Sequence, residues 1–159
     1  MATADVMLDV DPRELRLDAR ELDVVRSFAP VLEPRLGEMV DAYYAHLAST
    51  RYGSLMTADR IEIAKPIRIA HWRLLLTANF EALQRNYETN YRPRVLDGIF
   101  PPSVFLHAAN WFAAEFGRVV DRSADIPKAL KSELRTTLTR LAFYDLALAS
   151  KLCEVAWID

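Results

Sequence analysis

The chain has 159 residues, of which 52% are hydrophobic and 26% are charged. That length and apolar content are enough for one domain with its own hydrophobic core. The net charge is −2 and the isoelectric point is near 5.9, so neither a basic surface for nucleic acid nor an acidic disordered tail is expected. With only four glycines, the sequence is poor in the tight turns of a sheet protein.

No apolar run in the sequence is long enough to cross a membrane, and the opening stretch MATADVMLDVDPREL is polar and acidic. That stretch does not have the pattern of a signal peptide. The single cysteine, Cys153, excludes an internal disulfide and has apolar neighbours, which favour a small core or interface residue over a reactive thiol. These features predict a cytoplasmic protein without contact to a membrane.

The hydrophobic pattern is helical along nearly the whole chain. Residues 1–17 are expected to form a loose arm, with room for a short helix after Pro12. The segment DARELDVVRSF is predicted to start at an aspartate cap and to end at a junction at Pro30. The next segment, PVLEPRLGEMVDAYYAHLAS, carries one apolar stripe made of Leu36, Val40, Tyr43 and Leu47.

The following expected helix is ADRIEIAKPIRIAHWRLLLTA, with Thr57 as its cap. Pro66 lies inside it and is expected to kink it, because proline lacks a backbone donor. Five residues are predicted to share one face, namely Ile63, Ile67, His71, Leu74 and Ala78. The helix is expected to continue through FEALQRNYETNYR until RPRVLDGIFPP, where Pro93, Gly98 and a proline pair predict a break.

Two long helices are predicted after this break. The first, PSVFLHAANWFAAEFGRVVDRS, is rich in aromatic residues, and Pro102 suits its first turn. The second runs from about Ile126 to Ile158 and repeats apolar residues at alternating spacings of four and three, typical of a coiled-coil seam. Asp145 occupies one position of that seam. The chain is therefore predicted to be all-α, with six to seven helices of which the last two are the longest.

Long, partly apolar helices in a small domain often pack against a copy of themselves. The sequence therefore predicts a homodimer through the last two helices, with Trp111, Leu141 and Leu148 in the interface. One folded domain is expected over residues 18–158, after the arm of residues 1–17.

Three histidines are candidates for chemistry, but none has a metal-binding partner at helical spacing. His71 lies between apolar residues, which favours a satisfied core histidine over a pocket ligand, and His107 has the same two readings. His46 is expected at an exposed edge. The sequence contains no phosphate-binding glycine loop, no nucleophile elbow and no supported pair of catalytic carboxylates. A non-catalytic protein without a metal is therefore expected.

The tyrosine pair before His46 has two interpretations. Tyr43 belongs to the apolar stripe, and Tyr44 flanks it. The Tyr44 hydroxyl is expected either at a helix boundary, as an ordinary amphipathic aromatic, or in a cavity between helices.

Several segments in order, MVDAYYAHL, HWRLLLTANF and a helix closing in GIFPP, resemble the sensor globins of globin-coupled sensors and protoglobins. The closing FYDLALASKL is similar to the end of that family's last helix, and the resemblance covers Leu22 to Leu152. It implies a globin-like fold that dimerises through its last two helices. It also implies a domain that senses a gas through haem b and drives an attached transmitter module or a regulatory protein.

The resemblance assigns Tyr44 to the distal tyrosine that hydrogen-bonds haem-bound oxygen, and His71 to a packing position. It puts Val95 where the family has its iron-binding histidine. Valine cannot donate a lone pair to iron, and Pro93 and Pro66 are expected to disturb the helices on either side of the haem. The chain therefore resembles the members without haem, such as the N-terminal domains of stressosome regulators, and no cofactor is expected.

Three functions stay open. The first is a regulatory, signal-sensing domain in which a ligand or a partner shifts the packing of the final helices. The second is a haem-b sensor of O2 or NO with incidental dioxygenase or peroxidase activity, in which Tyr91, one turn before Val95, binds the iron. The third is a purely structural dimerisation module.

In the first hypothesis, the cavity left by the absent haem would hold a small apolar ligand. Its expected lining is Tyr44, Ile67, His71, Tyr91, Val95 and Phe105. Arg92 and Arg94 are expected either to be solvated or to contact a propionate or another anion.

Overall fold

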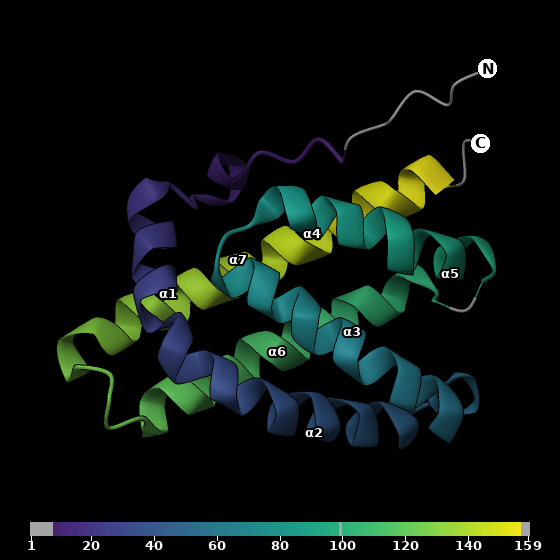
Figure 1. The fold of residues 1–159 in the computed structure, drawn as a ribbon, viewed down its shortest axis with the longest axis horizontal. Helices are drawn as coiled ribbons and strands as arrows, with labels where there is room; N and C mark the ends of the chain where they lie inside the picture. Colours follow the sequence, from purple (N-terminus) through teal and green to yellow (C-terminus); the bar gives the residue numbers. More distant parts are fainter. Residues whose placement is uncertain (1–7, 99, 157–159) are drawn as a thin grey trace.

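The structure is a computed structural model that describes residues 8–98 and 100–156, and every regular element in these ranges is helical (Figure 1). The prediction of an all-α protein is confirmed. The helices are α1 (Ala19–Leu32), α2 (Leu36–Ala48), α3 (Ala58–Leu76), α4 (Phe80–Asn86), α5 (Arg92–Leu96), α6 (Pro102–Arg122) and α7 (Lys128–Ala156). Part of the expected arm, residues 1–7, and Ile158 at the expected end of the last helix lie outside the described ranges.

Some of these helices run into one another, so the α-helices of the described residues form five continuous stretches and not six to seven separate helices, apart from the short 3-10 helices Pro12–Leu15 and Gly53–Leu55. A 3-10 turn, Glu33–Arg35, joins α1 to α2, and a π-helical turn, Tyr87–Tyr91, joins α4 to α5. The predicted junction at Pro30 is wrong. Pro30 lies in the last turn of α1, where the missing N–H costs one hydrogen bond and the chain tightens into the 3-10 turn without breaking.

The predicted start signals are confirmed. Pro12–Leu15 form a short 3-10 helix. Asp18 caps α1, because its Oδ1 accepts hydrogen bonds from the backbone N–H groups of Arg20 at 2.9 Å and Glu21 at 3.2 Å. Thr57 caps α3 through a hydrogen bond from the backbone N–H of Arg60.

The buried face of α3 differs from the prediction. Ile63 is 59% exposed, and the buried residues of the helix are Arg68, His71, Trp72, Leu75 and Leu76. The five predicted residues do lie within about 80° around a helix of 3.6 residues per turn, but the face that the fold buries is centred about 100° farther around. The helix continues through Pro66.

The chain turns sharply between α3 and α4, where the sequence predicted continuous helix. Ala78 has a φ of +52°, in the left-handed region that residues with a Cβ seldom adopt. Asn79 then caps α4 by accepting a hydrogen bond from the backbone N–H of Ala82 at 3.3 Å. The cap starts a new helix in a new direction.

The break after α5 is confirmed and has two parts. Just before α5, the N–H of Arg92 bonds to the carbonyl of Tyr87 five residues back, and the next residue, Pro93, has no N–H to restore the α-helical pattern. Just after α5, Gly98 takes a φ of +69° and its N–H bonds to the Val95 carbonyl at 3.1 Å. Pro102 then occupies the first turn of α6, as predicted.

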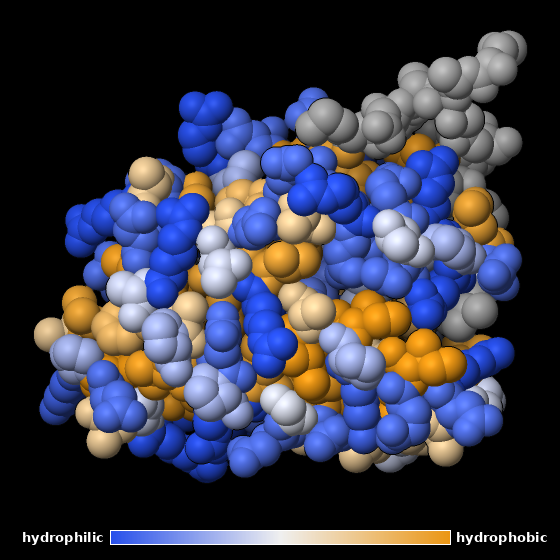
Figure 2. Space-filling view, in the orientation of Figure 1, coloured by the Kyte–Doolittle hydropathy of each residue, from blue (hydrophilic) through white to orange (hydrophobic). Residues whose placement is uncertain are grey.

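The two longest helices, α6 and α7, lie side by side and make the largest contact between helices of the fold. In Figure 1 they lie behind α3, while α2 runs along the lower edge. The core between these helices is rich in aromatic side chains, and its largest fully buried members are Trp72, Tyr43, Tyr87, Tyr144, Phe112 and Phe116. Figure 2 shows hydrophobic side chains reaching the surface between charged ones over α2 and α3.

The apolar seam of α7 faces this core. Leu141 and Leu148 are completely buried by the chain itself, so the expectation that they form a dimer interface is wrong. An apolar seam of this spacing can pack either against a partner helix or against the core of its own chain, and here α6 and its neighbours cover it. Trp111 is half-buried and stacks on the exposed His46 ring at a centroid distance of 4.8 Å.

Within the described ranges, no helix combines the length and apolarity needed to span a membrane.

Candidate functional site: a buried polar cluster

Buried polar side chains from α3, α4 and α7 meet in the interior of the fold. His71 of α3 and Asp145 of α7 are joined by a 2.6 Å contact between His71 Nε2 and Asp145 Oδ1. Asn86 at the end of α4 and Tyr87 in the π-helical turn complete the group. We call His71, Asn86, Tyr87 and Asp145 the polar cluster.

The hydrogen bonds of the polar cluster assign the His71 tautomer. Asn90 donates to the Asn86 side-chain oxygen at 2.6 Å, so the Asn86 amino group is the part that faces His71 Nδ1, at 3.0 Å. Nδ1 therefore accepts, and Nε2 carries the proton that His71 donates to Asp145. Both ring nitrogens of His71 are occupied, which is the satisfied core histidine that the sequence favoured.

Asp145 holds a buried negative charge with two donors on one oxygen. Besides His71, the Tyr87 hydroxyl donates to Asp145 Oδ1 at 2.5 Å and lies 3.0 Å from its backbone carbonyl. Burial alone would raise the pKa of Asp145, but the His71 imidazole, the hydrogen bonds from His71 and Tyr87, and the charge of Arg68 together bring that pKa below its ordinary value. Burial and the adjacent Asp145 carboxylate raise the pKa of Tyr87 well above its ordinary value, so Tyr87 is a neutral donor.

Sequence reasoning missed Asp145 as the partner of His71. A signal was present, because a carboxylate in an otherwise apolar seam is rarely buried unless it is paired. Nothing in the sequence, however, pairs a residue of α7 with one 74 positions earlier. Arg68 was missed as well, since it stands between two isoleucines in a helix full of charged residues.

The residues predicted to line a cavity are brought together, but the space between them is filled. Tyr44, Ile67 and Tyr91 line a crevice of about 10 Å³, room for roughly one water molecule. The rings of His71 and Phe105 lie 5.3 and 6.2 Å from the Tyr91 ring, and Val95 and Phe105 are buried. The space in which a small apolar ligand was expected is therefore filled by side chains.

A haem does not fit this arrangement. Ligand pockets for molecules of that kind have volumes of several hundred Å³, far above the crevice beside Tyr91. His71 has no free ring nitrogen. Burial raises the pKa of Tyr91 above its ordinary value, which disfavours the tyrosinate that would bind iron. The Tyr91 ring is also packed against His71, Tyr87, Phe100 and Phe105.

The remaining candidates lie at the surface. His107 is exposed and its ring lies 5.3 Å from that of Tyr52. Arg92 pairs with Glu88 at 3.1 Å, and Arg94 donates to the backbone carbonyl of Asn90. In the part of the chain that the structure describes, no three His, Cys, Asp or Glu side chains are placed to hold a metal ion.

No protein-family model and no curated protein matches the sequence. The membership of a globin family therefore stays a prediction from the sequence.

Proposed function

We propose that the chain is a non-catalytic regulatory domain of globin-like fold that works without haem and relays the binding of a ligand or a partner through paired helices. One observation carries this proposal. Val95, where the resemblance puts the iron ligand, is buried, and the Tyr91 ring one turn earlier is packed against aromatic rings and against His71 of the polar cluster. This cluster ties α3 and α4 to α7.

The polar cluster suits a relay because its contacts are directional. α7 spans 29 residues, or about 44 Å, and Asp145 lies in its C-terminal half. If α3 or α4 moves relative to α7, Asp145 loses a donor in a buried setting, which costs about 1–3 kcal/mol. Such a network favours a few discrete positions of α3 and α4 relative to α7 over a continuous range of positions. A ligand that binds one of these arrangements more tightly increases the population of that arrangement.

The interface of the proposed homodimer is the outer face of α6 and α7. Leu106 of α6 and Phe143 of α7 are 55% and 51% exposed. The two helices also border an open groove of about 540 Å³, whose lining includes the small residues Ala113, Ala114, Gly117, Ser132 and Thr136. Small side chains allow the helices of a second copy to approach closely, and these residues take the place of Leu141 and Leu148 in the dimer prediction.

Sedimentation equilibrium tests the paired state. A homodimer gives twice the chain mass of 18.1 kDa, and Phe143→Asp on the proposed interface is expected to give a folded monomer. Ile63→Asp is the matched control, because Ile63 is equally exposed but belongs to α3. A wild-type monomer at micromolar concentrations would contradict the homodimer, and a dimer that Phe143→Asp leaves intact would move the interface elsewhere.

Two alternatives have weaker support. A haem-b gas sensor with Tyr91 as the iron ligand requires an open pocket and an ionised phenol, and the packing around Tyr91 opposes both. A purely structural dimerisation module has no need of a buried charged cluster. The proposal also includes a cytoplasmic location and a downstream transmitter or regulatory protein, both as expectations from the sequence.

A further inference from the structure

Next to the polar cluster lies a buried arginine without a hydrogen-bond partner among the described residues. Arg68 of α3 is 4% exposed, and its Nε is buried and unpaired. No described carboxylate lies within 4.0 Å of its guanidinium, since Asp145 is bonded to His71 and Tyr87 instead. A buried charge of this kind is costly unless something accepts its hydrogen bonds.

Three phenols surround Arg68 and share its lack of acceptors. The guanidinium carbon lies 5.8 Å from the Tyr43 ring centroid and 5.4 Å from that of Tyr91, and Tyr44 packs edge-on against Tyr43 at 5.1 Å. The Tyr43 hydroxyl is buried without a partner, and those of Tyr44 and Tyr91 form no hydrogen bond with a described residue. Burial raises the pKa of Tyr43 to about 12, so its hydroxyl keeps its proton.

Every group in this set can donate a hydrogen bond, and the guanidinium cannot accept one. The phenol oxygens could accept from Arg68, but the Nε of Arg68 and the Tyr43 hydroxyl stay buried without a partner. An acceptor-only group placed among these side chains would satisfy several donors at once. Carboxylates and similar monoanions are such groups, and their hydrogen bonds with guanidinium and phenol are the strong, charge-assisted kind.

A path from the surface reaches two of these donors, Tyr44 and Tyr91, whereas Arg68 and Tyr43 line neither of its crevices. The crevice beside Tyr44 and Tyr91 shares Ala64, Arg94 and Phe100 with an outer crevice of about 80 Å³. The outer crevice is lined by these three residues and by Met56, Arg60 and Ile63. Neither lining contains a carboxylate, whereas two arginines face the crevices, so the local field favours an anion.

We propose that these crevices bind a short-chain carboxylate, with its carboxylate group at Arg68, Tyr44 and Tyr91 and its alkyl chain toward Met56 and Ile63. The outer volume limits the alkyl chain to a few carbons, because each water-sized unit occupies roughly 10–15 Å³ on the same measure. The carboxylate group of the ligand displaces the Tyr44 and Tyr91 hydroxyls as it enters, and the two hydroxyls then donate hydrogen bonds to it.

A short-chain carboxylate would be the ligand of the proposed regulatory domain. Only the effect of that ligand on α7 rests on the proposed function. The Tyr91 ring lies 5.3 Å from His71, so a ligand that moves Tyr91 acts directly on the polar cluster and through it on α7. Binding itself depends on the Arg68 site alone. A failure to bind would leave the sedimentation test of the dimer unaffected.

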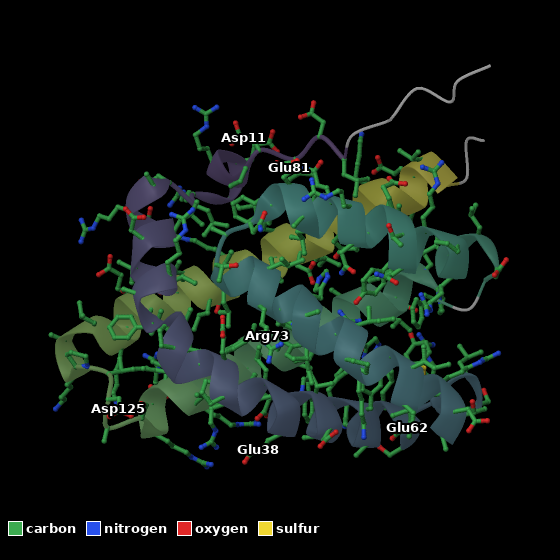
Figure 3. The ribbon with its side chains drawn as sticks, viewed as in Figure 1. Asp11, Glu38, Glu62, Arg73, Glu81 and Asp125 are labelled. Carbon is green, nitrogen blue, oxygen red and sulfur yellow. The ribbon has the colours of Figure 1, made fainter. Side chains whose placement is uncertain are left out.

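The experiment measures the thermal midpoint of the full chain against sodium butyrate, with ionic strength held constant by a bulky sulfonate salt. Arg68→Met removes the charge and keeps the length of the side chain. Ala64→Leu fills both crevices and leaves Arg68 in place. Arg73→Met is the control, because Arg73 is exposed on the same helix, about 140° around from Arg68 (Figure 3).

We expect a saturable rise of the midpoint in the wild type and in Arg73→Met, and an apparent affinity at least about tenfold weaker in Arg68→Met and Ala64→Leu. Two results would overturn the proposal, namely no saturable rise in the wild type, as for a crevice that holds only water, or equal rises in all four proteins. If Arg68→Met does not fold, the response of Ala64→Leu to butyrate tests the proposal, because this variant closes the crevices and keeps the charge of Arg68.

Discussion

At the scale of single residues, Asp145 is the position on which the interior depends most. A carboxylate taken out of water costs several kcal/mol unless donors replace its hydration, and here His71 and Tyr87 supply them. The same residue stands in a heptad-like seam with Leu141 and Leu148 on either side. From the sequence it is one polar seam position, and its role depends on a partner from α3 that folding brings beside it.

Asp145→Asn removes the charge with little change of shape. We expect the free energy of unfolding at pH 7 to fall by about 1–3 kcal/mol, because the two donors lose a charged acceptor. Urea unfolding checks this value. Asp121→Asn is the control, since Asp121 is half-exposed in its pair with Arg135, and a change within about 0.5 kcal/mol is expected there. Equal losses in both variants would contradict the account of Asp145.

The pH dependence follows from the same carboxylate. The pKa of Asp145 is below its ordinary value of 3.8 in the folded chain, so its contribution to stability is complete above about pH 4. That contribution is lost as the pH falls further, through the folded pKa. Urea unfolding of the wild type below pH 4 should therefore converge on that of Asp145→Asn. A difference between the two that stays constant at low pH would show that the charge is not responsible.

At the scale of helices, local signals predicted where elements begin better than how they face. The caps at Asp18 and Thr57 and the start at Pro102 depend on nearby backbone groups, so the sequence contains all the information for them. The face of α3 was predicted wrongly, because the choice between its two sides depends on what α2 and α7 present. Ile63 lies outside and the polar Arg68 inside.

The turn between α3 and α4 gives a prediction at this scale. Ala78 has a φ of +52°, which glycine adopts without strain. Ala78→Gly is therefore expected to raise the free energy of unfolding by about 0.5–1 kcal/mol, as measured by urea unfolding. Ala82→Gly, inside α4, is the matched control and should lower it by a similar amount. Destabilisation by both changes would show that the turn is not strained.

At the scale of the whole molecule, two features could not be read from the sequence. One is which side of α7 is internal, because the spacing of Leu141 and Leu148 suits a partner helix as well as the chain's own core. The other is whether the space near Val95 is open or filled by side chains. The sequence predicted that the iron ligand is absent, but only packing shows that Tyr91 and its neighbours fill the space.

The most direct test of the central claim, a regulatory domain that works without haem, is a hemin titration followed by the Soret band. The wild type and Val95→His are both expected to show no sharp, saturable band at one equivalent, because the pocket is closed by side chains and not merely short of a ligand. Val95→His should also be less stable by about 1–3 kcal/mol, since it buries an imidazole without a partner. A saturable Soret band in the wild type that disappears in Tyr91→Phe would contradict the account.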